Sequence, residues 1–181
     1  MTQTIRTLQT GLLLLGASLF SACSKQYPVL QTVASVDLNR YAGTWYEIAS
    51  LPQRFTKGCH CTTAQYKPHP DGYVEVYNSC REDAPTGDTK DVQGKAFPVE
   101  GSSNSKLKVQ FFWPFKGDYW ILDLADDYSY ALVGSPDRES LWILARESQL
   151  PPSEYERLVQ LASSKGFPVE ELQLMDQSCQ Q

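Results

Sequence analysis

The sequence predicts an all-β protein with a single α-helix near its C-terminus. Between residues 43 and 146, eight short stretches rich in β-branched and aromatic residues recur, with turn-forming residues between them. One segment of helical periodicity follows the last of these stretches. Strands at such regular spacing are typical of an antiparallel sandwich or barrel. The chain has 181 residues, a length that suits one domain.

The composition excludes several classes of protein. Aromatic residues make up 12% of the chain and charged residues 20%, which excludes general disorder. The net charge of −5 offers no broad basic surface to a phosphate backbone, so we expect no nucleic-acid partner. With only two histidines, His60 and His69, the chain has few ways to build a zinc site. We therefore expect no metal and no cofactor.

The expected strands are defined by their turn signals and by alternation. Residues 106–111 alternate cleanly, with Leu107, Val109 and Phe111 on one face. Closure of the sheet into a barrel would remove its exposed edges, and an eight-stranded barrel has room for one small ligand. In chain order the eight expected strands span residues 44–49, 59–67, 73–80, 91–97, 106–113, 119–124, 129–133 and 141–146.

The expected helix begins after Pro151 and Pro152. Ser153 is the predicted N-cap, and Glu156 would complete a capping box with it. Gly166 and Pro168 should end the helix. An apolar stripe at helical spacing should pack on the outside of the sheet. The stripe consists of Tyr155, Leu158, Val159 and Ala162.

The N-terminal residues 1–22 have the pattern of a secretory signal peptide. Arg6 precedes an apolar run over 11–20, which is shorter than the roughly 20 residues that a membrane-spanning helix needs. Residues 19–23 resemble the lipobox of bacterial lipoproteins, in which the cysteine, here Cys23, is acylated. Phe20 departs from that motif, which usually has a smaller aliphatic residue there. The alternative is a plain signal peptide cleaved near Ala22, with Cys23 as an ordinary thiol.

The residues that follow Cys23 indicate the cellular location of the mature chain. Ser24 resembles the outer-membrane sorting pattern of Gram-negative lipoproteins, so we expect a lipid-anchored protein in the cell outer membrane. Residues 23–36 form the expected lipidated N-terminus and tether. Residues 37–181 form the expected folded domain.

Four further cysteines remain, an even number in an exported protein, so two disulfides are expected. A four-residue turn over 68–71 would pair residue 67 with residue 72 and place Cys59 opposite Cys80, within disulfide range. Cys61 is then left for Cys179. The alternative is four free or metal-bound thiols.

Three ordered segments resemble the signatures of the lipocalin family. Residues 36–49, with Gly43 and Trp45, resemble the first signature, and residues 51–58 resemble the first loop of the bacterial lipocalin and apolipoprotein D branch. Residues 123–133 resemble the second signature, and residues 134–146, ending in Arg146, resemble the third. The resemblance runs over 36–179. It implies an eight-stranded antiparallel up-and-down β-barrel with one C-terminal α-helix packed outside.

The resemblance also assigns structural roles. The family ties a cysteine on its second strand to the C-terminal tail, which supports the Cys61–Cys179 pair. Its signatures gather at the closed end of the barrel, where the arginine packs over the tryptophan. We therefore expect Gly43, Trp45, Tyr128 and Arg146 to form a structural closed-end cluster rather than ligand contacts.

A ligand site is expected inside the barrel and at its open end. Loops 51–58, 81–90, 113–118 and 134–140 should share that end. Alternation turns Val109, Phe111 and Trp113 to one side, and the resemblance turns Trp120 and Leu122 inward. An aromatic-lined apolar pocket suits an acyl chain. The alternative is that these aromatic residues fill a closed core.

Charged residues near the expected mouth add little to this interpretation. Arg54, Lys57, Arg81 and Lys116 lie on or near the loops at that end. Any of them could meet an anionic head group. A solvated surface charge is the more typical fate of each.

The predicted function is binding rather than catalysis. We expect an outer-membrane lipocalin that binds fatty acids or lysophospholipids, for lipid storage or transport in envelope maintenance. The sequence leaves open whether it forms a homodimer. One alternative is an isomerase-type lipocalin enzyme, which a free thiol facing the pocket would support. The other is a structural envelope lipoprotein with a filled barrel.

Overall fold

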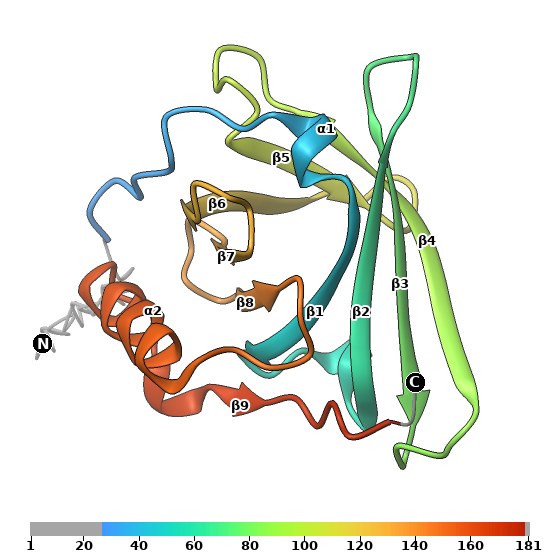
Figure 1. Ribbon diagram of the computed structural model, residues 1–181. Helices are drawn as coiled ribbons and strands as arrows, with labels where there is room; N and C mark the ends of the chain where they lie inside the picture. Colours follow the sequence, from blue (N-terminus) through green and yellow to red (C-terminus); the bar gives the residue numbers. More distant parts are fainter. Residues whose placement is uncertain (1–26, 180–181) are drawn as a thin grey trace, which may run out of the picture.

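Eight antiparallel strands close into a barrel, and one helix packs on its outside (Figure 1). The computed structural model describes residues 27–179. The expected signal peptide and Cys23 lie outside the described residues. Among the described helices, none has the length and apolarity needed to cross a membrane.

The sheet follows the chain order, as the barrel prediction requires. β1 pairs with both β8 and β2 and so closes the ring, and the short β9 pairs with the far end of β1. This topology confirms the predicted up-and-down barrel; β9 was not predicted. The strands are β1 (Gly43–Ser50), β2 (Cys59–Pro68), β3 (Val74–Glu82), β4 (Thr89–Pro98), β5 (Lys106–Gln110), β6 (Gly117–Leu124), β7 (Tyr130–Gly134), β8 (Leu141–Ala145) and β9 (Gln173–Leu174).

The register between β2 and β3 differs from the prediction. Lys67 lies opposite Glu75 rather than Gly72, because the turn spans residues 69–73. The His69 carbonyl accepts from the Gly72 N–H at 3.0 Å, and Gly72 adopts a φ of +85° that favours glycine. An irregularity between residues 60 and 63 then shifts the register again, so Cys59 lies opposite Glu82. The Cys59–Cys80 disulfide still forms, across a Cα–Cα distance of 5.5 Å.

Strand β5 is shorter than predicted. It ends at Gln110 rather than at residue 113, and the Phe115 N–H donates to the Phe112 carbonyl at 2.9 Å to close a turn. Pro114 has no N–H with which to continue a ladder. Trp113 therefore lies on a loop and not on the inner face of a strand.

Two apolar cores lie on the two sides of the sheet. One fills the barrel interior, and the other lies between the outer face and α2 (Pro152–Ser164). Leu158 and Ala162 of the predicted stripe are fully buried there, with Tyr155 and Val159 packed beside them. The helix is therefore amphipathic in the predicted sense.

The helix ends differ in how well they were predicted. The helix begins one residue before the predicted Ser153 cap, because Pro152 suits the first helical position and Pro151 takes the N-cap position without a side-chain hydrogen bond. The predicted capping box is absent. At the C-terminus, Gly166 has a φ of +86°, and the Phe167 N–H donates to the Ala162 carbonyl. This is a Schellman motif, in keeping with the predicted stop.

Residues 27–36, which the sequence assigns to the tether, pack along the outside of the barrel. The Val33 N–H donates to the Ile121 carbonyl at 3.0 Å, and the Val36 N–H to the Ser103 carbonyl at 2.9 Å. Leu30 of this segment is buried in the outer core, whereas Val36 is buried against the interior core. The segment therefore covers part of both cores, which gives it a packing role.

Three short helical segments complete the described chain. α1 (Leu38–Tyr41) precedes β1, with Asp37 as its N-cap. η1 (Arg54–Thr56) lies in the β1–β2 loop, and η2 (Val169–Glu171) follows α2.

Candidate functional site

The barrel interior is tightly filled at one end and open toward the other. On β4, Ala96 is fully buried, whereas Val92 further along the same face is partly exposed. On β5, Leu107 is buried, whereas Val109 and, directly after the strand, Phe111 are partly exposed although they pack against the interior core. Inward apolar side chains that keep some exposure indicate that the interior meets solvent at that end, which we call the mouth.

Four loops surround the mouth, as the alternation of antiparallel strands predicts. They span residues 51–58, 83–88, 111–116 and 135–140. The opposite, closed end carries α1 and the turns at 69–73, 99–105 and 125–129. Of the five predicted ligand-lining residues, Val109 and Phe111 face the interior near the mouth.

The other three predicted lining residues lie elsewhere. Trp113 is 87% exposed on the β5–β6 loop. Trp120 and Leu122 belong to the outer core, under α2 and the N-terminal segment. The inward residues of β6 are instead Tyr119 and Ile121. Both faces of this strand are covered, so no polar side of the strand shows which residues point inward.

Sequence reasoning missed Trp142 as an interior residue. It lies at the start of β8, next to the mouth, is partly exposed and packs against the interior core. Its ring stacks on that of Tyr119, with centroids 6.3 Å apart. Trp142 lies between outward-facing Leu141 and Ile143, so alternation alone was again ambiguous.

Three buried tyrosines form a hydroxyl network deep in the barrel. The Tyr119 hydroxyl lies 2.8 Å from that of Tyr41 and accepts from that of Tyr66 at 2.9 Å. Burial raises the pKa of Tyr66 to about 12 and raises the pKa values of Tyr41 and Tyr119 above their ordinary range. These hydroxyls stay protonated and form a floor beneath the open part of the barrel.

Two further polar groups face the interior. Glu47 is almost completely buried on β1, and it accepts a hydrogen bond from the Ser50 hydroxyl at 2.7 Å. Burial raises the pKa of this carboxyl. Asn78 lies between Ala64 and Val92 in neighbouring strands, and its buried Oδ1 has no hydrogen-bond partner within the described chain.

The predicted closed-end cluster is assembled at the opposite end. Trp45 is fully buried, and the Arg146 guanidinium lies 4.0 Å from its ring centroid. Arg146 also donates to the carbonyls of Thr44 and Arg40, each at 2.8 Å. Gly43 has a φ of +93°, and a Cβ there would lie 3.4 Å from Arg146 Nη1.

Tyr128 completes this cluster. Its hydroxyl accepts from the Asp37 N–H at 2.9 Å, and its carbonyl accepts from Arg146 Nε at 3.3 Å. The cluster therefore links α1, β1 and the β6–β7 turn through hydrogen bonds between its side chains and backbone groups.

Three of the charged residues predicted near the mouth, Lys57, Arg81 and Lys116, lie at the surface. Lys57 is exposed. Arg81 donates to the Thr89 hydroxyl at 2.6 Å, and the Lys116 ammonium lies 4.1 Å from the ring centroid of Phe97. Arg54 belongs to η1 in the β1–β2 loop.

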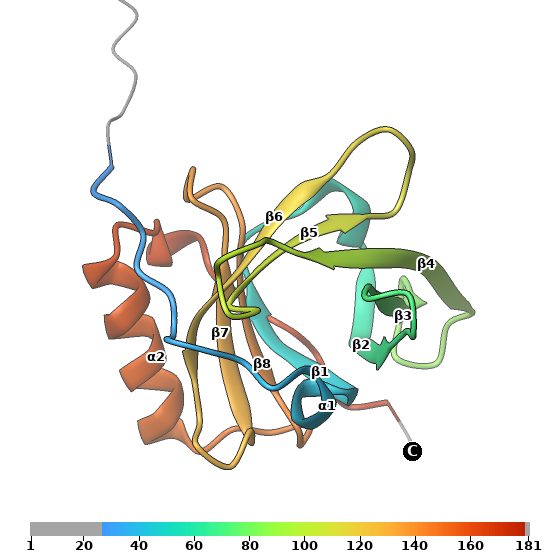
Figure 2. The same cartoon turned by 90° about the horizontal axis from the view of Figure 1, so that it is seen from above.

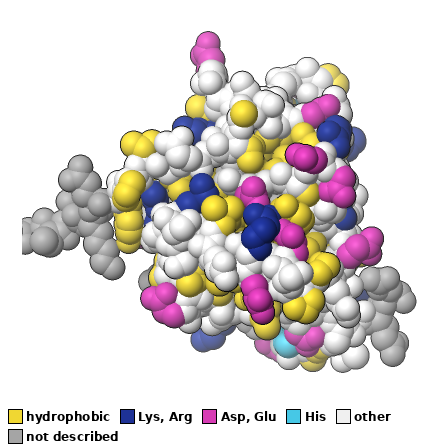
Figure 3. Space-filling view, turned by 60° about the vertical axis from the view of Figure 1, so that its left-hand side comes forward, with side chains coloured by type: hydrophobic (Ala, Val, Ile, Leu, Met, Phe, Trp, Pro, Cys, Tyr) yellow, Lys and Arg dark blue, Asp and Glu magenta, His cyan; other side chains and the backbone are white. Residues whose placement is uncertain are grey.

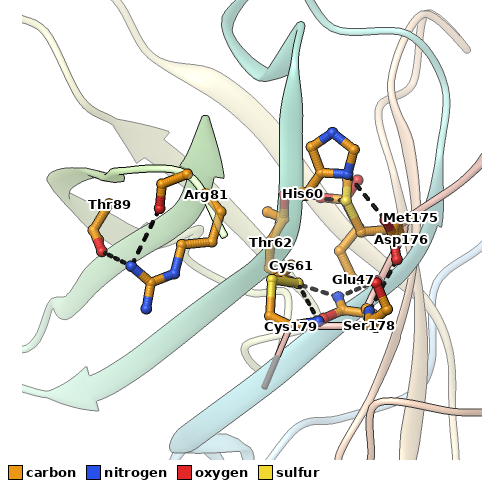
Figure 4. The surroundings of a disulfide bond; sticks show 12 residues. Glu47, His60, Cys61, Thr62, Arg81, Thr89, Met175, Asp176, Ser178 and Cys179 are labelled. Carbon is orange, nitrogen blue, oxygen red and sulfur yellow. Dashed lines mark hydrogen bonds and ion pairs between the residues drawn. A yellow bond between two sulfur atoms is a disulfide. The ribbon is translucent and has the colours of Figure 1, made fainter. Parts of the chain in front are cut away.

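The second disulfide anchors the C-terminal tail beside the mouth (Figure 4). Cys61 and Cys179 are bonded, and the Cys61 N–H donates to the Asp176 carbonyl at 2.7 Å. His60 Nδ1 lies 3.1 Å from the Asp176 carboxylate. All four cysteines of the described part are therefore disulfide-bonded, and none of them offers a free thiol of the kind that would support the isomerase alternative.

Outside the barrel, Trp120 lines a broad groove of about 1350 Å³. The groove lies between the N-terminal segment, the β7–β8 loop and η2. Figure 3 turns forward the side of the molecule that lies on the left in Figure 1, and it shows acidic and basic side chains interspersed with apolar ones. This face has no single-sign field that would select a charged partner.

Comparison with known proteins agrees with this geometry. The family profile of the lipocalin-like domain matches residues 36–177. The outer membrane lipoprotein Blc of Vibrio cholerae is 34% identical, over 88% of this chain and 94% of its own. Apolipoprotein D of Bos taurus is 37% identical, over 78% of this chain and 77% of its own. Among solved structures, insecticyanin from the tobacco hornworm Manduca sexta superimposes with a TM-score of 0.67 at 24% identity, over 86% of this chain and 89% of its own.

Proposed function

The chain belongs to the lipocalin family, and we propose from this that it binds a single-chain lipid, a fatty acid or a lysophospholipid, in the open half of its barrel. One observation carries the proposal. Val109, Phe111 and Trp142 face inward near the mouth and remain partly exposed, whereas the deeper interior is filled. An apolar wall that opens to solvent is the environment an acyl chain would enter.

The mechanism is partition of the chain out of water. Each buried methylene contributes about 0.8 kcal/mol, so a long acyl chain has ample driving force. The tyrosine floor limits how deep the chain can reach. Asn78 supplies a buried amide acceptor that a ligand donor group would satisfy.

The proposed setting is the outer membrane of a Gram-negative envelope. The supporting observations are the lipobox-like residues 19–23 and the similarity to proteins named outer membrane lipoproteins. Acylation of Cys23 is tested by intact mass. The mature chain should begin at Cys23 and carry added acyl mass, and a chain that begins elsewhere without that mass would contradict the anchor.

A matched pair of tryptophans tests the ligand site. Trp142 faces the interior and Trp120 faces the outer groove, and both are partly buried. In a titration with a fluorescent fatty acid, Trp142→Ala should weaken binding about tenfold to a hundredfold because ring contacts to the chain are lost. Trp120→Ala should leave the affinity within about twofold of the wild type.

The outcomes separate the alternatives. Weaker binding in Trp120→Ala alone would move the site to the outer groove. Failure of the wild-type protein to take up any lipid would favour a structural lipoprotein with a filled barrel.

A further inference from the structure

The β5–β6 loop displays three aromatic side chains to solvent. Phe112, Trp113 and Phe115 are 71%, 87% and 77% exposed. Large apolar side chains grouped on a surface in this way are typical of an interaction site rather than of an ordinary solvated loop. We propose that this loop is a membrane-docking element that inserts into a lipid bilayer and holds the mouth of the barrel against it.

The chemistry of the loop favours a lipid surface. Tryptophan and phenylalanine settle at the boundary between head groups and acyl chains. Residues 111–116 contain no acidic side chain, and Lys116 is exposed where an anionic head group could meet it. Phe115 N–H is already bonded to the Phe112 carbonyl, and Pro114 has no N–H, so insertion would strip water from few backbone donors.

The path of the N-terminal segment supports the same orientation. Arg138, in the β7–β8 loop at the mouth, donates to the Pro28 carbonyl at 2.7 Å, and its guanidinium lies 5.0 Å from the Tyr27 ring centroid. The described chain therefore starts at the mouth end, where the β5–β6 and β7–β8 loops also project (Figure 2). Tyr27 lies four positions after Cys23, a span of at most about 14 Å.

Two contacts at one end would fix the mouth toward the bilayer. The anchor contact rests on the acylation of Cys23 proposed above, whereas the loop contact rests on the exposed aromatic residues alone. A lipid could then pass between bilayer and barrel with little exposure to water. A second copy of the chain or a soluble protein would give no such link between the loop and the anchor.

The test uses the full-length acylated protein in vesicles of phosphatidylethanolamine and phosphatidylglycerol whose acyl chains carry bromine, which quenches nearby tryptophan. Bromine should quench Trp113 in the wild type. Trp113→Phe should lose this component, and the matched Trp120→Phe should retain it. Quenching that persists in Trp113→Phe reports the remaining tryptophans, such as Trp142 near the mouth, and not the loop.

A second pair of variants keeps the reporter and changes the contact. Phe112→Ser with Phe115→Ser should reduce the quenching of Trp113 several-fold. Leu174→Ser is the control: it changes an exposed apolar residue of β9, beside β1 and far from β5 around the sheet, and should leave the quenching unchanged.

Three results would overturn the docking proposal. Protein that floats with the vesicles while Trp113 is not quenched would leave the acyl anchor intact and refute the loop contact. Protein that does not float would refute both contacts. Loss of a dimer in the Phe112→Ser/Phe115→Ser variant, with no bromine quenching in the wild type, would assign the loop to a second copy of the chain.

Discussion

Replacing Trp45 with alanine should lower the free energy of unfolding by about 3–5 kcal/mol, the usual cost of removing a large buried aromatic side chain. Trp45 is fully buried, and its Nε1 donates to the Tyr41 carbonyl at 2.8 Å. The substitution also removes the ring beneath the Arg146 guanidinium, a contribution of about 0.5–2 kcal/mol within that total. Arg146 keeps its backbone acceptors, so the closed end should loosen rather than come apart.

The assay combines urea denaturation with a fatty-acid titration on the same samples. The affinity of Trp45→Ala for the fatty acid should change little, because Trp45 lies at the end of the barrel away from the mouth. Trp45→Phe is the matched control: it keeps a ring under Arg146 and loses the hydrogen bond to Tyr41, so the cost should be roughly 1–2 kcal/mol. A stable Trp45→Ala variant that no longer binds lipid would refute the assignment of the two ends.

Two further predictions concern stability. Burial raises the pKa of the Glu47 carboxyl above its ordinary 4.5. The contribution of the carboxyl to the free energy of unfolding is therefore fully present below pH 4.5 and is lost as the pH rises through the raised pKa. Glu47→Gln should gain stability relative to the wild type at pH 7 but not at pH 4, and an equal change at both pH values would contradict the buried carboxyl. Replacing Cys61 and Cys179 together with serine should cost roughly 4–5 kcal/mol in the chain-entropy view, an upper figure, because the bond joins residues 118 apart. The midpoint of urea denaturation measures this cost, and a midpoint unchanged from the wild type would show that the tail adds nothing.

Much of the fold was predictable because its signals are local. Turn residues separate the strands, and Lys106, Leu107 and Lys108 alternate in a strand with only one buried side. The stripe on α2 has a single apolar face, so its burial was predictable as well. The closed-end cluster was predictable only through the family signatures, since its members lie far apart in sequence.

The predictions are wrong where the local sequence pattern is the same for two alternative structures. Residues 119–122 are apolar on both sides of β6, so alternation could not decide between Tyr119 and Trp120 as the inward residue. Pairing with β5 decides it, because Leu107 faces inward and lies opposite Tyr119. The predicted β2–β3 register is wrong for another reason: the turn at residues 69–73 is one residue longer than its proline and aspartate residues indicate.

The lipid-binding claim is tested most directly by native mass spectrometry of the protein purified from its own envelope under mild conditions. We predict a species that carries one single-chain lipid per protein, released on unfolding and depleted in Trp142→Ala but not in Trp120→Ala. A wild-type protein that carries only its covalent acyl chains, and stays so after incubation with fatty acid and lysophospholipid, would contradict the claim.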